Sequence, residues 1–159
     1  MRRVDDRPGP AALDAWRTFL QAHAVLTRRL GASLEAEQGL GLGEYDVLLQ
    51  LREAPEHALR MSELAERVLL SRSGLSRLVD RMARDGLVDR QRCPGDARGT
   101  LAVLTPAGRA RLRRAATTHL PGVADVTARL EPGELEQLAG LLRRLADAGA
   151  SPGGCEPDG

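Results

Sequence analysis

The stretch from residue 62 to residue 105 constrains the fold most strongly, because four short elements with clear boundaries follow one another there. Ser62 and Ser71 are the expected N-caps of two helices, and Gly86 stands where a left-handed residue ends the second. Two strand-like runs, 87–93 and 100–105, flank a Pro/Gly-rich turn and predict a β-hairpin. This order predicts a helix–turn–helix followed by a wing, within an α+β fold that is mostly α.

The second of these helices, 72–85, has two chemically distinct faces. At 100° per residue, its apolar residues fall within one sector and predict a buried stripe. The opposite face is rich in Arg and Ser, which can bind guanine edges and backbone phosphates. The expected DNA contacts are Ser71, Arg72, Ser73, Ser76, Arg77, Arg81 and Arg84. The alternative is a solvated face with i,i+4 ion pairs such as Asp80–Arg84.

The charge is divided unevenly along the chain. The net charge is +1, yet segment 60–114 contains thirteen arginines against six acidic residues. All 23 basic residues are Arg, which by itself indicates a compositional bias and not nucleic-acid binding. A strongly basic segment within a near-neutral chain nevertheless favours a polyanionic partner.

The predicted wing adds a second basic signal. Arg98 stands at the tip or descending edge of the hairpin, where an arginine can enter a narrow minor groove. Asp96, two residues earlier, could hold the guanidinium in place. The alternative is a turn-stabilising Asp beside a solvated Arg.

The remaining helices flank this lobe. In 11–37, Trp16, Leu20, His23, Thr27, Leu30 and Leu34 recur in steps of four and three, the pattern of a helix packed along a partner. Further helices are expected at 44–54, from Pro106 to about 129 with a bend near Pro121, and from about 131 to 148. The predicted organisation is a disordered arm (1–10), dimerisation helices (11–37 and 106–148), a winged lobe (44–105) and a disordered tail (149–159).

Several kinds of chemistry are disfavoured. Aromatic residues make up 2% of the chain, which argues against a single-strand binder built on stacking platforms. Two cysteines, Cys93 and Cys155, do not form a disulfide framework, and the three histidines show no metal-ligand spacing. We find no nucleophile motif, phosphate loop, signal peptide or membrane span, so we expect a cytoplasmic protein that is not an enzyme and needs no cofactor.

The combination of these motifs resembles the MarR family of winged helix-turn-helix transcriptional regulators. The matching stretches are MSELAERVLLSRSGLSRLVDRMARDGLVDR (61–90), DAR in the wing (96–98) and LAVLTPAGRA (101–110). The resemblance implies a homodimer whose terminal helices interlock, with 72–85 in a major groove and 96–98 in a minor groove. It further implies a ligand-responsive repressor of a pseudo-palindromic operator. Family thiol sensors have a cysteine near the N-terminal helix, which this chain lacks.

Two points stay open at this stage. The main rival is a winged-helix protein-interaction module without DNA binding; a small enzyme using the crevice beside the lobe is a weaker one. The polar pair His23 and Thr27 in the helix 11–37 seam is either a register-setting layer or part of an effector site. In the second case, Trp16, His23 and Tyr45 would bind a small aromatic or anionic effector.

Overall fold

The computed structural model of the chain describes residues 7–68, 70–93 and 96–149, and the side chains of 96–98 lie outside this description. The chain divides into two compact units, Met1–Gly122 and Val123–Gly159. The first contains the predicted helix–turn–helix and wing. The second contains the end of one helix and the helix that follows it.

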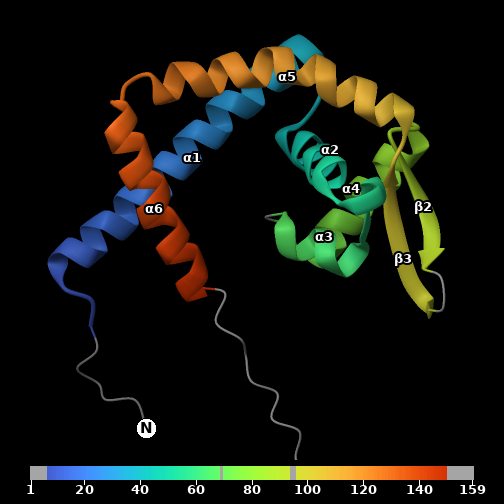
Figure 1. The fold of residues 1–159 in the computed structure, drawn as a ribbon, viewed down its shortest axis with the longest axis horizontal. Coiled ribbons are helices and arrows are strands. Elements are labelled where there is room, and N and C mark those ends of the chain that lie inside the picture. The colour runs from blue at the N-terminus through green and yellow to red at the C-terminus, as the bar shows by residue number, and fades with distance from the viewer. Residues whose placement is uncertain (1–6, 69, 94–95, 150–159) are drawn as a thin grey trace, which may run out of the picture. The chain divides into compact units, whose positions relative to one another are not determined.

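The helices of the described residues match the predicted order (Figure 1). They are α1 (Pro10–Gln38), α2 (Leu42–Glu53), α3 (Met61–Arg67), α4 (Arg72–Arg84), α5 (Pro106–Thr127) and α6 (Pro132–Gly149), with a short 3-10 turn at Pro55–His57. α1 begins at the last residue of the predicted arm. α5 passes through Pro121 and into the second unit.

A small antiparallel sheet completes the first unit. Its strands are β1 (Ala58–Arg60), β2 (Val88–Cys93) and β3 (Asp96–Leu104), in the order β1-β3-β2. The β2–β3 hairpin is the predicted wing, and it lies beside α3 and α4 (Figure 1). β1 was not predicted, because three residues give no alternating pattern to recognise.

One predicted cap is correct and one is wrong. Ser71 Oγ accepts a hydrogen bond from Gly74 N at 3.1 Å and caps α4. Ser62 is not the N-cap of α3, which begins at Met61 with Arg60 as its N-cap. Glu63 Oε2 accepts the Arg60 N–H there at 3.1 Å, so a carboxylate inside the first turn replaces the expected serine.

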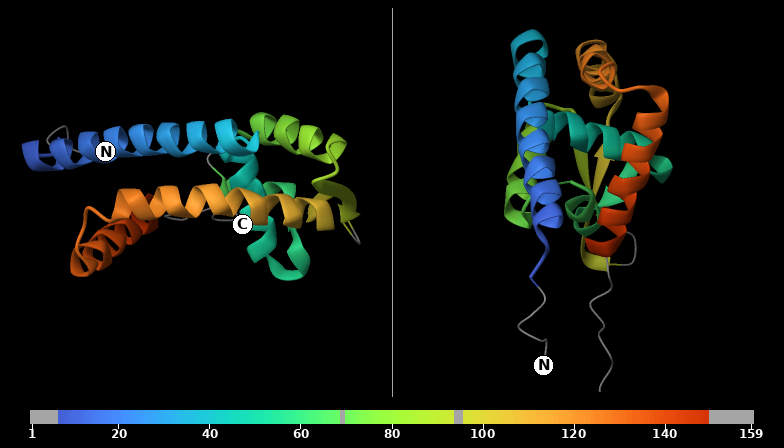
Figure 2. Two further views of the ribbon diagram at one scale, coloured as in Figure 1. Left: turned by 90° about the horizontal axis from the view of Figure 1, so that it is seen from above. Right: turned by 90° about the vertical axis from the view of Figure 1, so that its left-hand side faces the viewer.

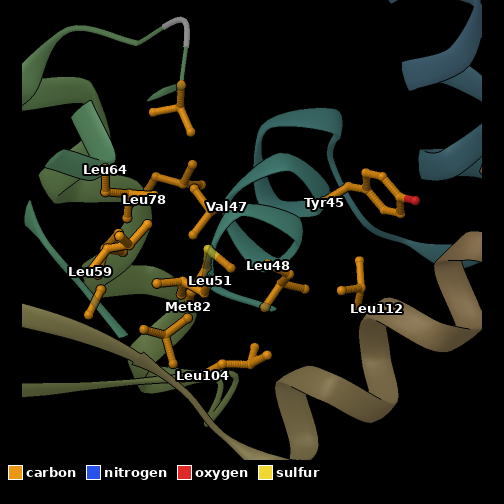
Figure 3. Packing of buried hydrophobic residues seen from close by; sticks show 14 of the residues in the cluster. Tyr45, Val47, Leu48, Leu51, Leu59, Leu64, Leu78, Met82, Leu104 and Leu112 are labelled. Atoms are coloured by element: carbon orange, nitrogen blue, oxygen red, sulfur yellow. The ribbon is translucent and has the colours of Figure 1, made fainter. Parts of the chain in front are cut away.

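The core of the first unit surrounds α2. Val47 and Leu51 are fully buried and point toward α3 and α4, whereas Tyr45 projects from the other side of α2 (Figure 3). Leu48 meets Leu112 of α5 in this cluster. The core therefore fixes α4 against α2 through aliphatic side chains, as the low aromatic content predicts.

The C-terminal half of α1 lies beside the part of α5 between Arg111 and Gly122 (Figure 2). Thr118 accepts a hydrogen bond from Gln38 Nε2 at 2.8 Å and donates one to Glu37 Oε2 at 2.9 Å. Arg111 donates to the carbonyls of Gln38 and Gly39 at the end of α1. These contacts set the wall of the pocket described below.

Candidate nucleic-acid interface

α4 has the two faces that its sequence predicts. Leu75, Val79 and Met82 are fully buried and Leu78 is nearly so, and this stripe packs into the core. The opposite side of the helix is open to solvent. A helix held by one face leaves the other available to enter a groove of DNA.

The predicted contact residues occupy that side with two qualifications. Ser71, Arg72, Ser73, Arg77, Arg81 and Arg84 are exposed, and Ser76 is half-buried. Arg81 is engaged by α2: its Nε and Nη2 donate to Glu44 Oε1 at 3.2 and 3.1 Å. Glu44 also accepts the Gly41 N–H at 2.9 Å through its other oxygen, so one carboxylate caps α2 and holds α4.

A basic hollow of about 370 Å³ lies between the start of α3, the start of α4 and the sheet. Three arginines line it together with hydroxyl and small residues: Arg60, Met61, Ser62, Arg72, Ser76, Arg90, Gly99 and Thr100. Three guanidiniums around one hollow suit a phosphate group. Sequence reasoning missed Arg60 and Arg90, although the outward position of Arg90 on β2 was a usable signal.

The wing is linked to α4 by an ion pair. Arg90 Nη1 of β2 binds Asp80 Oδ1 of α4. The i,i+4 pair Asp80–Arg84, which the alternative interpretation of α4 expected, is therefore replaced by a contact between elements. The backbone places Asp96 and Arg98 at the start of β3, next to the end of the hairpin that is far from α5.

A second hollow, of about 400 Å³, lies between α1, α2 and α5 within the first unit. It contains two of the three predicted effector residues, His23 and Tyr45, and its full lining is His23, Thr27, Leu42, Gly43, Tyr45, Asp46, Leu49, Val68, Leu70 and His119. Trp16 is not among these residues and lies two turns away along α1, about 10 Å. Its ring instead contacts Phe19, with centroids 5.8 Å apart.

His119 is the residue that α5 contributes to this pocket. Its ring lies 4.4 Å from the Tyr45 ring, and its Nδ1 is buried with no hydrogen-bond partner among the described residues. Burial lowers the pKa of His119 and raises the pKa of Tyr45, because both charged forms lose hydration. The pocket therefore presents a neutral imidazole and a neutral phenol.

The polar pair on α1 behaves differently from the expectation of a shared polar layer. Thr27 Oγ1 donates to the His23 carbonyl at 2.7 Å, so the threonine is satisfied within its own helix. His23 is exposed, and its ring lies 6.4 Å from that of Phe19. Thr27 thus needs no partner from another chain.

Other chemistry finds little support in the described part of the chain. Cys93 is a buried free thiol at the end of β2, and Cys155 lies outside the described residues. In 7–68, 70–93 and 96–149 there is no group of three His, Cys, Asp or Glu side chains that could hold a metal ion. None of the described helices is long and apolar enough to cross a membrane.

A helix–turn–helix with an arginine-rich outer face, followed by a β-hairpin, defines a winged-helix protein of the DNA-binding type. Comparisons with known proteins give the same class. Residues 38–99 match the model of the MarR family. The chain is 31% identical over 110 residues to the HTH-type transcriptional repressor YetL of Bacillus subtilis, a match that covers 69% of this chain and 66% of that protein.

Solved structures extend the likeness over nearly the whole chain. Sco3205, a MarR family transcriptional regulator from Streptomyces coelicolor solved in complex with DNA, is 35% identical with a TM-score of 0.84, covering 95% of each chain. The PcaV regulator of the same organism, solved with its natural ligand, is 32% identical with a TM-score of 0.67, covering 94% of this chain and 99% of that one. The chain belongs to the MarR family of winged-helix transcriptional regulators.

Proposed function

We propose that this chain is a ligand-responsive repressor that binds a pseudo-palindromic operator in double-stranded DNA as a homodimer. The observation that supports it most is α4, which buries one face and offers arginines on the other. The relatives agree: one is named a repressor, one was solved with DNA and one with a ligand. The role needs no catalysis and places the protein in the cytoplasm.

Base readout and backbone contact are assigned to different residues. Arg77 is exposed on α4 and is proposed to bind a guanine in the major groove, with Ser73 and Arg84 beside it. Arg60, Arg72 and Arg90 surround the basic hollow and are proposed to bind one backbone phosphate. Arg98, with Asp96, is proposed to contact a minor groove.

Dimerisation is proposed from apolar side chains that each unit leaves exposed. In the first unit, Trp16 of α1 is 53% exposed and Leu20 is 46% exposed. In the second unit, Leu141 and Leu145 of α6 are 55% and 57% exposed. Exposed rows of apolar residues on amphipathic helices are stabilised when another protein surface buries them. A second copy of the chain presents the same rows and can bury them in a symmetric interface.

The test measures affinity for the DNA upstream of the chain's own gene by fluorescence anisotropy, at several salt concentrations. We expect a dimeric complex, a steep loss of affinity with salt and half-sites about 10 base pairs apart. Arg77→Ala should cost about 1–3 kcal/mol on the operator and relax preference at one base pair. Arg113→Ala, an exposed arginine of α5, is the matched control. Salt-independent binding would favour the protein-interaction module.

A further inference from the structure

The pocket between α1, α2 and α5 differs in charge from two further hollows among the described residues of the first unit. The basic hollow is lined by Arg60, Arg72 and Arg90, and a third hollow beside α4 is lined by Arg77 and Arg81. Among the described residues that line the α1–α2–α5 pocket there is no arginine at all, in a chain with 23. Its one carboxylate is Asp46.

Asp46 is suited to meet a cation. It is half-buried on α2, and its Oδ1 accepts a hydrogen bond from the neutral amide of Gln50 at 3.4 Å. Burial raises the pKa of Asp46, because the carboxylate has lost water without gaining a cation. Arg52, also on α2, acts on Tyr45 through its charge, but it does not line the pocket and it pairs with Glu53 at 3.8 Å.

The aromatic wall favours the same ligand charge. The ring centroids of Tyr45 and His119 lie 4.4 Å apart with the rings tilted by 40°, and the face of a neutral phenol attracts a cation. The buried His119 Nδ1 has no partner among the described residues and, in the tautomer protonated at Nε2, accepts an N–H. Leu42, Leu49 and Val68 supply apolar surface for a hydrocarbon body. An anionic group would meet the Asp46 carboxylate, and no arginine lines the pocket to pair with it.

We infer that the α1–α2–α5 pocket binds an organic amine with an apolar body. Asp46 and the face of the Tyr45 ring hold the ammonium group, and His119 Nδ1 accepts a hydrogen bond from one of its N–H groups. This inference rests on the proposed effector role of the pocket. It assigns a cationic ligand to the pocket, where the sequence suggested a small aromatic or anionic effector. His23, exposed at the rim of the pocket on α1, is not required for it.

Three probes with the same phenylalkyl body and a cationic, neutral or anionic head group test the inference: 3-phenylpropylamine, 3-phenylpropanol and 3-phenylpropionate. Each is titrated into the full-length protein by calorimetry, and operator release is measured in parallel. We expect the amine to bind about tenfold or more tightly than the acid, with the alcohol between them. Asp46→Asn should abolish this preference while leaving the alcohol unchanged. Glu66→Gln, an exposed residue of α3 outside the pocket, should leave all three unchanged.

The outcomes separate this inference from the proposed function. Preference for the acid, or no binding of any probe, overturns the cation site. A preference for the amine that survives Asp46→Asn also overturns it. If the amine binds through Asp46 but never releases the operator, the cation site stands and the proposed effector role of the pocket fails. Loss of amine affinity in His119→Phe, with Asp46 intact, would support the N–H contact.

Discussion

Glu44→Gln tests how α4 is held in place for DNA binding. Glu44 accepts the Gly41 N–H at the start of α2 with one oxygen and the Arg81 guanidinium with the other, and its side chain is only 14% exposed. The amide of glutamine can accept only through its oxygen, so one of the two contacts is lost. A charge-assisted hydrogen bond at a mostly buried carboxylate contributes about 1.5–3 kcal/mol. Arg81 is 55% exposed and screened, so we expect about 1–2 kcal/mol of lost stability.

The direction in which Glu44→Gln changes DNA affinity distinguishes a role in positioning α4 from a purely electrostatic effect of the lost charge. Removing an acidic group from a DNA-facing lobe raises affinity for a polyanion. If the Glu44–Arg81 pair positions α4, the variant should bind its operator about fivefold more weakly, the equivalent of about 1 kcal/mol. Arg81→Gln should also weaken binding, yet leave the slope of affinity against salt unchanged, because its guanidinium neutralises no phosphate.

Anisotropy titrations across a salt series and urea unfolding provide both measurements. Glu53→Gln is the matched control, since Glu53 lies on the same helix, is 57% exposed and pairs with the exposed side chain of Arg52. It should bind DNA as tightly as the parent or slightly more so. If Glu44→Gln behaves like this control, the positioning role is refuted. If Arg81→Gln lowers the salt slope by about one, Arg81 contacts a phosphate directly.

Three further predictions concern stability and pH. Gly108→Ala should lose about 2 kcal/mol or more in urea unfolding, because its Cβ would clash with the Leu87 carbonyl oxygen. Gly31→Ala, whose Cβ would lie 3.6 Å from its nearest neighbour, should gain about 0.5–1 kcal/mol; equal effects would refute the close approach at Gly108. Ser71→Ala should lose about 1 kcal/mol with the loss of the α4 cap, and an unchanged midpoint would contradict that cap. Because burial lowers the pKa of His119, the unfolded chain takes up its proton first as pH falls below about 6.5. Stability should therefore decline from pH 7 to pH 5, and less steeply in His119→Phe; the same slope in both would show that His119 is not the titrating group.

Much of the winged lobe followed from local sequence. The 3.6-residue period of α4 predicted which four apolar residues are buried, because burial on one side of a helix needs only that period. Ser71 and Gly86 marked the ends of α4 for equally local reasons: a hydroxyl that caps free N–H groups, and a residue at φ 72°. The hairpin followed from its turn residues.

Tertiary structure decided where local rules compete or long-range contacts intervene. Ser62 is a good cap by itself, but pairing of Arg60 with Leu101 extends the backbone up to residue 60, and α3 then begins at Met61. Asp80 could have paired with Arg84, one turn away on α4, but the sheet places Arg90 next to Asp80 and the ion pair forms there.

The effector pocket shows the same limit most clearly. Periodicity placed His23 on α1 and an apolar stripe on α2, but no local pattern relates Tyr45 to a histidine 74 residues further along. The packing of α5 along α1 brings His119 onto the Tyr45 ring and leaves Asp46 without an arginine beside it. Sequence determines which side chains a helix presents, since that depends on neighbours three and four residues away. The charge of a pocket depends on which helices meet, and only the folded chain decides that.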